Sequence, residues 1–291
     1  MKKLLVTGES GLLGNMIVKL VSDQVVIPCH YTRPLNADSL KMDITDENEV
    51  SALFKQLKPD VVIHTASQTN VDKCEIQKEE AWKTNVEGAR NIAVACGKEN
   101  IKLIYISTDY VFDGNKGYYK EEDETNPINY YGLTKLEGEK EVVRHCQNYV
   151  ILRTSVIYGW HPWKLNFATW VITQLKQGKA ISVVDDHYNT PTLADNLAQV
   201  CLEVAHKKLN GIYHASGSER ISRFEFAKKI AKFFNLDLHL LKPIKMIQLT
   251  SWIAKRPLDS SLDTSKLQKR LKTKLPNIDE GLEKMKESER P

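Results

Sequence analysis

The chain has 291 residues, 42% hydrophobic and 27% charged, which is the composition of a globular protein with a sizeable core. Its 41 basic and 37 acidic side chains give a formal charge of +4, too small an excess to indicate a nucleic-acid partner. No apolar run approaches the ~18 residues of a membrane span, and the five cysteines show no C-x-x-C pairing, so we expect a cytoplasmic protein with reduced thiols and no membrane partner.

Short apolar runs alternate with amphipathic segments through the first half of the chain. The predicted strands are 2–7, 24–29, 61–66, 101–108 and 149–155, and the predicted helices are 12–21, 47–57, 79–99 and 130–146. This order is typical of parallel βαβ units. It predicts an α/β fold with a Rossmann-type doubly wound parallel sheet that is covered on both faces.

The alternation loosens after Thr154. The pattern predicts helices at 165–178, 193–207 and 222–236, and strands at 180–184 and 211–216. We expect an NAD(P)-binding domain over 1–155, with its sheet completed by parts of 180–215. A smaller C-terminal substrate-binding region over 156–291 would be interleaved with it. The charged tail from Leu262 favours a solvated helical face over a binding tail.

A glycine motif follows the first predicted strand. In "TGESGLLG", Gly8, Gly11 and Gly14 are spaced G-x-x-G-x-x-G between a strand and a helix. Glycine lets the backbone approach a ligand closely, and the N-terminus of the following helix offers free N–H groups to a pyrophosphate. The motif in this context predicts a dinucleotide-binding loop.

The end of the second predicted strand decides the type of dinucleotide. "CHYTRP" contains Arg33 and no acid, and a guanidinium suits a 2′-phosphate, so we expect NADPH, with NADH as the second option. A surface arginine in a loop is the competing interpretation. Asp43 either contacts the adenine or caps the helix that begins near Glu47.

The stretch "NYYGLTK" (129–135) offers an acid for carbonyl reduction. If it is helical, Tyr131 and Lys135 lie one turn apart on one face, and Tyr130 points elsewhere. A phenol has a pKa near 10, which a neighbouring ammonium lowers. Thr108, at the carboxyl end of a predicted strand, offers a hydroxyl to hold a carbonyl oxygen.

With these motifs together, the chain resembles the extended short-chain dehydrogenase/reductases, and within them the dTDP-4-dehydrorhamnose reductases. The supporting stretches are "TGESGLLG", "HTAS" (64–67), "TNVEGA" with Asn85, "STDYVFDG", "NPINYYGLTKLEGEK" (126–140), "VVDDHYNTPT" (183–192) and "RPLDSSLDTSKL" (256–267). The resemblance covers nearly the whole chain. The chain is also similar to the regulatory beta subunits of methionine adenosyltransferase, which share this fold and serve as binding partners.

The resemblance implies a role for each matching residue. Thr108, Tyr131 and Lys135 are the expected catalytic residues. The expected cofactor-binding residues are Gly8, Ser10, Gly11, Leu12, Leu13, Gly14, Arg33, Asp43, Ile44, Thr65, Ala66, Ser67, Asn85, Tyr131 and Lys135. The expected substrate-binding residues are Thr69, Val71, Thr108, Tyr110, Tyr131, Val156, Asn166 and Arg256.

Two departures from the family pattern concern the sugar. Val156 stands where the family often has tryptophan, and "DHYNTPT" has His187 and Asn189 in place of the family residues. Arg256 grips a diphosphate or makes a surface salt bridge. We assign no metal ligand, because the eight histidines include no H-E-x-x-H and form no zinc-type cluster.

The function we predict is reduction of the 4-keto group of a nucleotide-linked deoxysugar by NADPH, in a chain that pairs as a homodimer. The alternative is a non-catalytic NADP-binding subunit of a methionine adenosyltransferase. An epimerase or dehydratase on the same scaffold is a third option. Asp109 is followed by Tyr110 and not by a second acid, which argues against dehydration.

Overall fold

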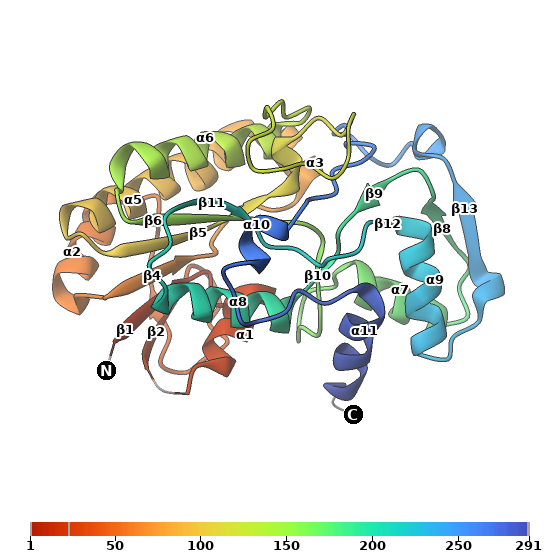
Figure 1. Ribbon diagram of the computed structural model, residues 1–291, viewed down its shortest axis with the longest axis horizontal. Coiled ribbons are helices and arrows are strands. Elements are labelled where there is room, and N and C mark those ends of the chain that lie inside the picture. Colours follow the sequence, from red (N-terminus) through yellow and green to blue (C-terminus); the bar gives the residue numbers. More distant parts are fainter. Residues whose placement is uncertain (1, 23, 290–291) are drawn as a thin grey trace.

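A seven-stranded parallel sheet forms the larger half of the molecule (Figure 1). The structure is a computed structural model that describes residues 2–22 and 24–289. The strands are β1 (Lys3–Thr7), β2 (Val25–His30), β3 (Leu40–Lys41), β4 (Val61–His64), β5 (Lys102–Thr108), β6 (Tyr149–Thr154) and β11 (Gly211–His214). Their order is β11-β6-β5-β4-β1-β2-β3, so the winding reverses between β1 and β4. The predicted Rossmann-type fold is confirmed, and this switch point is where such sheets bind ligands.

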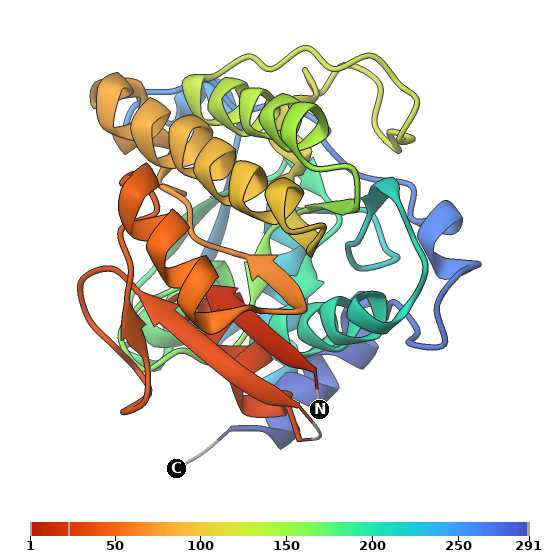
Figure 2. The same cartoon turned by 90° about the vertical axis from the view of Figure 1, so that its left-hand side faces the viewer.

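Helices cover both faces of the sheet. One face carries α2 (Glu47–Leu57), α5 (Gly88–Lys98) and α6 (Tyr130–His145), which Figure 2 shows side by side. The other face carries α1 (Leu12–Leu20) and α8 (Ala194–His206). Strand β1 shows why both faces are covered, since its side chains are apolar on each side. Leu4 and Val6 join the core under α1 and α8, while Leu5 joins the core under α2 and α5. Successive side chains of a strand point to opposite faces, so a strand buried on both faces is apolar throughout.

The second, smaller part of the molecule is built from three helices and three pairs of short strands. The helices are α7 (Phe167–Lys176), α9 (Arg223–Phe233) and α11 (Ile278–Glu287), and they enclose an apolar core of their own. The strand pairs are β7 (Ile157–Tyr158) with β10 (Thr192–Leu193), β9 (Tyr188–Asn189) with β12 (Ile221–Ser222), and β8 (Ile181–Val184) with β13 (Leu241–Ile244). Within the interval 180–215, only β11 therefore joins the large sheet. The short helix α10 (Ser265–Gln268) lies against β11.

The predicted single helix over 79–99 is wrong in its middle. The chain forms α4 (Lys78–Trp82), then a π-helical turn (Lys83–Glu87), then α5, and a short helix α3 (Val71–Ile76) precedes them. The π-helical turn contains Asn85, whose buried amide bonds groups far away in the sequence. A widened turn held by tertiary contacts leaves no signal in local periodicity. Within the described ranges, no helix has the length and apolar character that crossing a bilayer needs.

Candidate active site

A cavity of about 860 Å³ opens at the carboxyl ends of the central strands. Its walls come from the glycine loop after β1, from the segments that follow β2, β4 and β5, and from α6. The segments 156–157 and 164–166 and the first residue of α9 close it from the side of the smaller part. The cavity therefore joins the switch point of the sheet to the second half of the chain.

Most residues that the sequence singled out line this cavity. They are Gly8, Ser10, Gly11, Leu12, Leu13, Gly14, Asp43, Ile44, Thr65, Ala66, Ser67, Thr69, Val71, Thr108, Tyr110, Tyr131, Lys135, Val156 and Asn166. Three others, Arg33, Asn85 and Arg256, are not among the lining residues, and each is held by a partner that is described below.

The glycine loop is shaped so that side chains cannot replace its glycines. Gly8 has φ 70°, and a Cβ there would lie 2.7 Å from the amide nitrogen of Ala66. A Cβ at Gly14 would overlap the carbonyl oxygen of Gly8 and lie 2.9 Å from Glu9 Cα. Gly11 is the N-cap of α1 and makes no side-chain cap, so the first N–H groups of this helix have no side-chain acceptor there. A pyrophosphate fits this cradle, because it is an anion at a helix N-terminus.

The loop after β2 is fastened to the glycine loop from within. The buried carboxylate of Glu9 accepts hydrogen bonds from the Leu35 amide at 2.9 Å and from Asn36 Nδ2 at 2.6 Å. Asp43 accepts from the amide and hydroxyl of Thr45 and lines the cavity. The N-cap of α2 is Asp46, so Asp43 does not cap this helix.

Asn85 does not line the cavity but hydrogen-bonds Ser67, which does. Its Oδ1 accepts hydrogen bonds from Ser67 Oγ and from the Gln68 amide, both at 2.8 Å. Its Nδ2 donates to the Gln68 carbonyl at 3.1 Å and to Thr134 Oγ1 at 3.0 Å. The amide thus locks the loop after β4 onto α6, and Ser67 is the member of this group that lines the cavity.

Helix α6 places Tyr131 and Lys135 in the cavity wall, one turn apart. Its N-cap, Asn129, accepts a hydrogen bond from the Gly132 amide at 2.8 Å. Thr108, at the end of β5, lines the same cavity as Tyr131, and its hydroxyl donates to Asp109 Oδ1 at 3.1 Å and accepts from the Tyr110 amide at 3.2 Å. Tyr130 points elsewhere: its ring lies 5.3 Å from the Lys78 ammonium, and it does not line the cavity. Of the two adjacent tyrosines, Tyr131 is the one that can reach a bound substrate.

The electrostatics of Tyr131 and Lys135 differ from the sequence-based expectation. Burial raises the pKa of the Tyr131 phenol, and the nearby Thr108 hydroxyl opposes the rise in part. The Lys135 ammonium donates to the Ile106 carbonyl at 2.8 Å and lies 4.1 Å from the centre of the Tyr105 ring. Burial lowers the pKa of Lys135 to about 7, and the Glu139 carboxylate opposes this shift. The phenol is therefore neutral at neutral pH, which is the form that gives away a proton.

A buried ion pair supports the lysine. Arg153 donates to Glu139 through Nε at 2.9 Å and through Nη2 at 2.7 Å, and Ser107 Oγ donates to the same carboxylate at 2.5 Å. Glu139 is one helical turn after Lys135 on α6. Among the residues that the structure describes, Arg153 Nη1 is buried without a hydrogen-bond partner, but removing either member would leave a buried charge unpaired, so the pair fixes α6 against β5 and β6.

The structure also brings in residues that the sequence did not indicate. Asp109 is buried at the cavity wall, where Ser155 and Ser260 donate to its carboxylate at 2.8 and 2.5 Å. Burial raises the pKa of this carboxyl, and the two hydroxyls oppose the rise. Arg223, the first residue of α9, also lines the cavity. Its only sequence signal is a basic residue after the serine that caps a predicted helix, which is too common to indicate a site.

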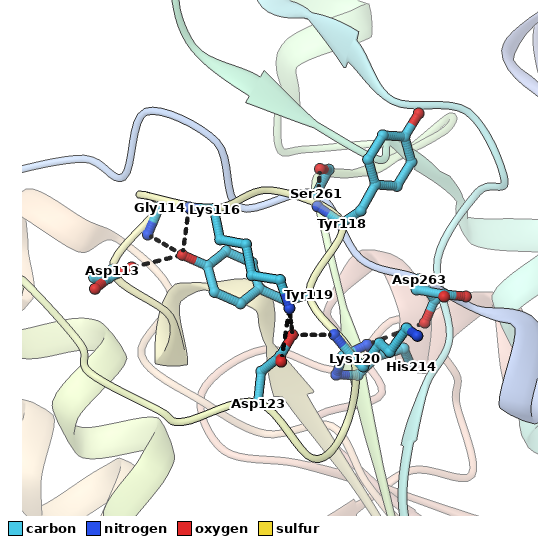
Figure 3. A network of polar contacts seen from close by, with 10 residues as sticks. All are labelled: Asp113, Gly114, Lys116, Tyr118, Tyr119, Lys120, Asp123, His214, Ser261 and Asp263. Atoms are coloured by element: carbon cyan, nitrogen blue, oxygen red, sulfur yellow. Dashed lines mark hydrogen bonds and ion pairs between the residues drawn. The ribbon is translucent and has the colours of Figure 1, made fainter.

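The loop that follows Thr108 is anchored by a polar network (Figure 3). The Tyr119 hydroxyl donates to Asp113 Oδ1 at 2.5 Å and accepts from the Gly114 amide at 3.0 Å. The Tyr118 amide donates to Ser261 Oγ at 2.8 Å. Residues 113–119 are thereby tied to the segment around residue 261, which fixes the path of the chain after the carboxyl end of β5.

Val156 occupies a strained position at the cavity. Its φ is 44°, in the left-handed region that β-branched residues avoid. The Thr192 amide donates to its carbonyl at 3.1 Å, so the strand pair of β7 and β10 holds this conformation. Strain of this kind typically costs about 1–3 kcal/mol and persists where the surroundings over-determine it.

Comparisons with known proteins agree with this arrangement. The chain matches the RmlD substrate binding domain family over residues 1–290. It is 33% identical to a dTDP-4-dehydrorhamnose reductase of Aggregatibacter actinomycetemcomitans, over 92% of each chain. It is 35% identical to the methionine adenosyltransferase 2 subunit beta of Danio rerio, over 92% of this chain and 84% of that protein. The crystal structure of dTDP-4-dehydrorhamnose reductase from Bacillus anthracis in complex with NADP superimposes with a TM-score of 0.91 at 33% identity, covering 99% of this chain and all of that one.

A match over the whole chain, together with a shared fold, shows the family directly. This chain belongs to the RmlD substrate binding domain family.

Proposed function

We propose that this chain is an NADPH-dependent reductase that acts on the 4-keto group of a nucleotide-linked deoxysugar, with dTDP-4-dehydrorhamnose as the leading substrate. One observation carries the proposal. Thr108, Tyr131 and Lys135 line the same cavity as the glycine loop, so an acid for a carbonyl oxygen and a cradle for a dinucleotide face one space. The relatives that are named dTDP-4-dehydrorhamnose reductases support this activity.

The residues of the chain divide the work between binding and proton transfer. Residues 8–14 would hold the pyrophosphate, and Ser67 and Lys135 would hold the nicotinamide half of the cofactor. When bound, the nicotinamide supplies the hydride. Tyr131 gives its proton to the carbonyl oxygen, which becomes the hydroxyl of the product, and Thr108 holds that oxygen in line. The Tyr131 phenol holds its proton at neutral pH, as a phenol with a pKa of ~10 does and as burial reinforces by raising the pKa.

NADPH is the cofactor in this proposal, with NADH as the second option. The reductase of Bacillus anthracis was crystallised with NADP. The loop after β2 carries Arg33, whose guanidinium suits a 2′-phosphate, although it does not line the cavity. We propose that the Arg33 side chain moves to the 2′-phosphate when NADPH binds, and that this contact makes NADPH the preferred nucleotide.

A regulatory subunit of a methionine adenosyltransferase is the second candidate. The identity to the Danio rerio subunit beta, 35%, is comparable with that to the reductases, so overall similarity does not separate the two. The presence of Thr108, Tyr131 and Lys135 in one cavity with the glycine loop supports the catalytic function. A cytoplasmic location and a homodimer complete the proposal. The five cysteines are buried free thiols, as a reducing compartment favours.

Loss of NADPH absorbance tests the proposal. The purified protein is mixed with NADPH and dTDP-4-dehydrorhamnose, then with keto-sugars carried on UDP or GDP, and each is repeated with NADH. We expect oxidation of NADPH that requires the keto-sugar, with one nucleotide clearly preferred. If no keto-sugar is reduced and the protein instead binds a methionine adenosyltransferase tightly, the regulatory function replaces the catalytic one.

A further inference from the structure

The cavity contains a guanidinium without a carboxylate partner. Arg223 lies at the start of α9, lines the cavity and is only partly accessible. Its guanidinium carbon is 4.9 Å from the centre of the Phe167 ring, and the Tyr110 phenol lies near enough in the same cavity wall to oppose the lowering of the Arg223 pKa by burial. Throughout residues 2–22 and 24–289, no carboxylate oxygen lies within 4.0 Å of this guanidinium. Asp109 is nearby, but its carboxylate is occupied by serine hydroxyls.

Arg256 presents the opposite case. Its Nη2 forms an ion pair with Asp72 Oδ2 at 2.8 Å, and its Nη1 donates to the Ala254 carbonyl at 2.7 Å. Its guanidinium carbon lies 4.9 Å from the centre of the Trp252 ring, and the residue does not line the cavity. The arginine that the sequence indicated for a diphosphate is therefore already neutralised by protein groups, and the arginine that it did not indicate faces the ligand space.

A shielded cation without a counter-charge destabilises the folded protein until an anion joins it. Burial disfavours the charged form of Arg223 and lowers its pKa, yet a guanidinium keeps its proton at any pH that the protein experiences. The desolvation cost is offset only by a negative partner with matching hydrogen-bond geometry. A guanidinium binds phosphate oxygens through two parallel N–H donors, which makes a phosphate group the best-fitting partner.

The position of Arg223 identifies which phosphate it can reach. Its neighbour Tyr110 packs edge-on against the catalytic Tyr131, with ring centres 6.0 Å apart. Arg223 is thus separated from the acid by one tyrosine ring. In a nucleotide-linked 4-keto sugar, the diphosphate is attached across the sugar ring from the reacting carbonyl. With the carbonyl oxygen at Tyr131, the diphosphate points away from that residue, and Arg223 is an arginine that lines the same cavity beyond Tyr110.

We propose that Arg223, and not Arg256, binds the diphosphate of the nucleotide-sugar substrate. This assignment rests on the proposed function and extends it, because it makes the negative charge of the substrate a requirement for binding. It also explains why the Arg223 cation is tolerated near Tyr131: the substrate diphosphate supplies the negative partner that the protein does not.

Calorimetric titration of dTDP into the NADP-loaded protein tests the assignment. We expect Arg223→Gln to weaken dTDP binding on the order of 10- to 100-fold, the usual effect of losing hydrogen bonds to a charged group. Arg223→Lys keeps the charge without the two-pronged geometry and should restore part of the affinity. Arg256→Gln and Arg220→Gln serve as matched controls. Arg220 lies just upstream of Arg223, pairs with Asp259 at 2.7 Å, and does not line the cavity.

The outcomes separate the assignment from the proposed function. If the wild type binds dTDP and Arg223→Gln binds it equally well, Arg223 is not the diphosphate residue. If Arg256→Gln loses the affinity instead, the subsite belongs to Arg256. If the wild type binds neither dTDP nor UDP, the substrate class itself is wrong and both proposals fall. Unchanged NADP affinity and unchanged melting temperature in Arg223→Gln exclude misfolding as the cause of a loss.

Discussion

The guanidinium carbon of Arg33 lies 3.8 Å from the centre of the Trp163 ring. This stack joins the loop after β2 to the loop that precedes α7. Nearby, the ring Nε2 of His161 is 3.2 Å from the carbonyl oxygen of Ser10 in the glycine loop. Two segments that are far apart in the sequence therefore meet beside the proposed cofactor cradle, and Arg33 is held where it can be released to a phosphate.

The first prediction concerns cofactor preference. A cation–π contact at an exposed site is worth ~0.5–1 kcal/mol, whereas hydrogen bonds to a charged group are worth ~1.5–3 kcal/mol, so a 2′-phosphate draws Arg33 away from Trp163. Arg33→Ala should raise the KM for NADPH on the order of 10-fold and leave that for NADH within about 2-fold. Steady-state kinetics with both cofactors measures this. An equal rise in KM for NADPH and for NADH would mean that Arg33 does not recognise the 2′-phosphate.

The second prediction concerns the acid. Tyr131→Phe should lower kcat by about 10²- to 10⁴-fold, because it removes the proton donor, and should leave NADPH affinity unchanged. Tyr130→Phe is the matched control, since that ring points away from the cavity, and its kcat should stay near the wild-type value. A Tyr131→Phe protein that turns over normally would show that another group donates the proton.

The third prediction separates two effects of the glycine loop. Gly14→Ala should destabilise the protein by about 1–3 kcal/mol, because the added Cβ overlaps the Gly8 carbonyl in a packed turn. At Gly11 the nearest atom to an added Cβ is 3.2 Å away, so Gly11→Ala should change the melting temperature much less. Both variants should weaken NADPH binding, which fluorescence titration of the reduced nicotinamide reports. Equal melting temperatures for the two variants would contradict the steric argument.

The fourth prediction follows from the depressed pKa of Lys135. The unfolded chain keeps this ammonium protonated up to a pKa of ~10.4, whereas the folded protein releases the proton at a pKa of about 7. Folding is therefore penalised at low pH, and the penalty disappears as pH rises through this window. The stability of the wild type relative to Lys135→Met should increase by a few kcal/mol between about pH 6.5 and 9.5.

Urea midpoints of wild type and Lys135→Met across this pH range give the measurement. Lys140→Met is the control, because its exposed ammonium pairs with Glu137 at the surface and should produce no such trend. A stability difference that does not vary with pH would mean that Lys135 titrates normally in the folded protein.

Much of the fold and of the site follows from the sequence alone. The runs around β1, β4 and β5 are mostly apolar because both of their faces are buried, and this pattern is local. The glycine motif and the Tyr131–Lys135 spacing are likewise local, because each depends on backbone geometry within one turn or one helix. These features predicted the parallel sheet, the cradle and the candidate catalytic residues.

Only the tertiary structure decided which charges are free to bind. The sequence motif indicated Arg256 for a diphosphate and gave no sign of Arg223, but it did not show which of the two has a partner within the protein. The fold brings Asp72 to Arg256 across 184 positions and leaves Arg223 with a tyrosine and a phenyl ring. The same holds for the π-helical turn at Asn85, which depends on groups 17 and 49 residues away. Pairing and burial are set by contacts between distant segments, and local sequence patterns do not encode them.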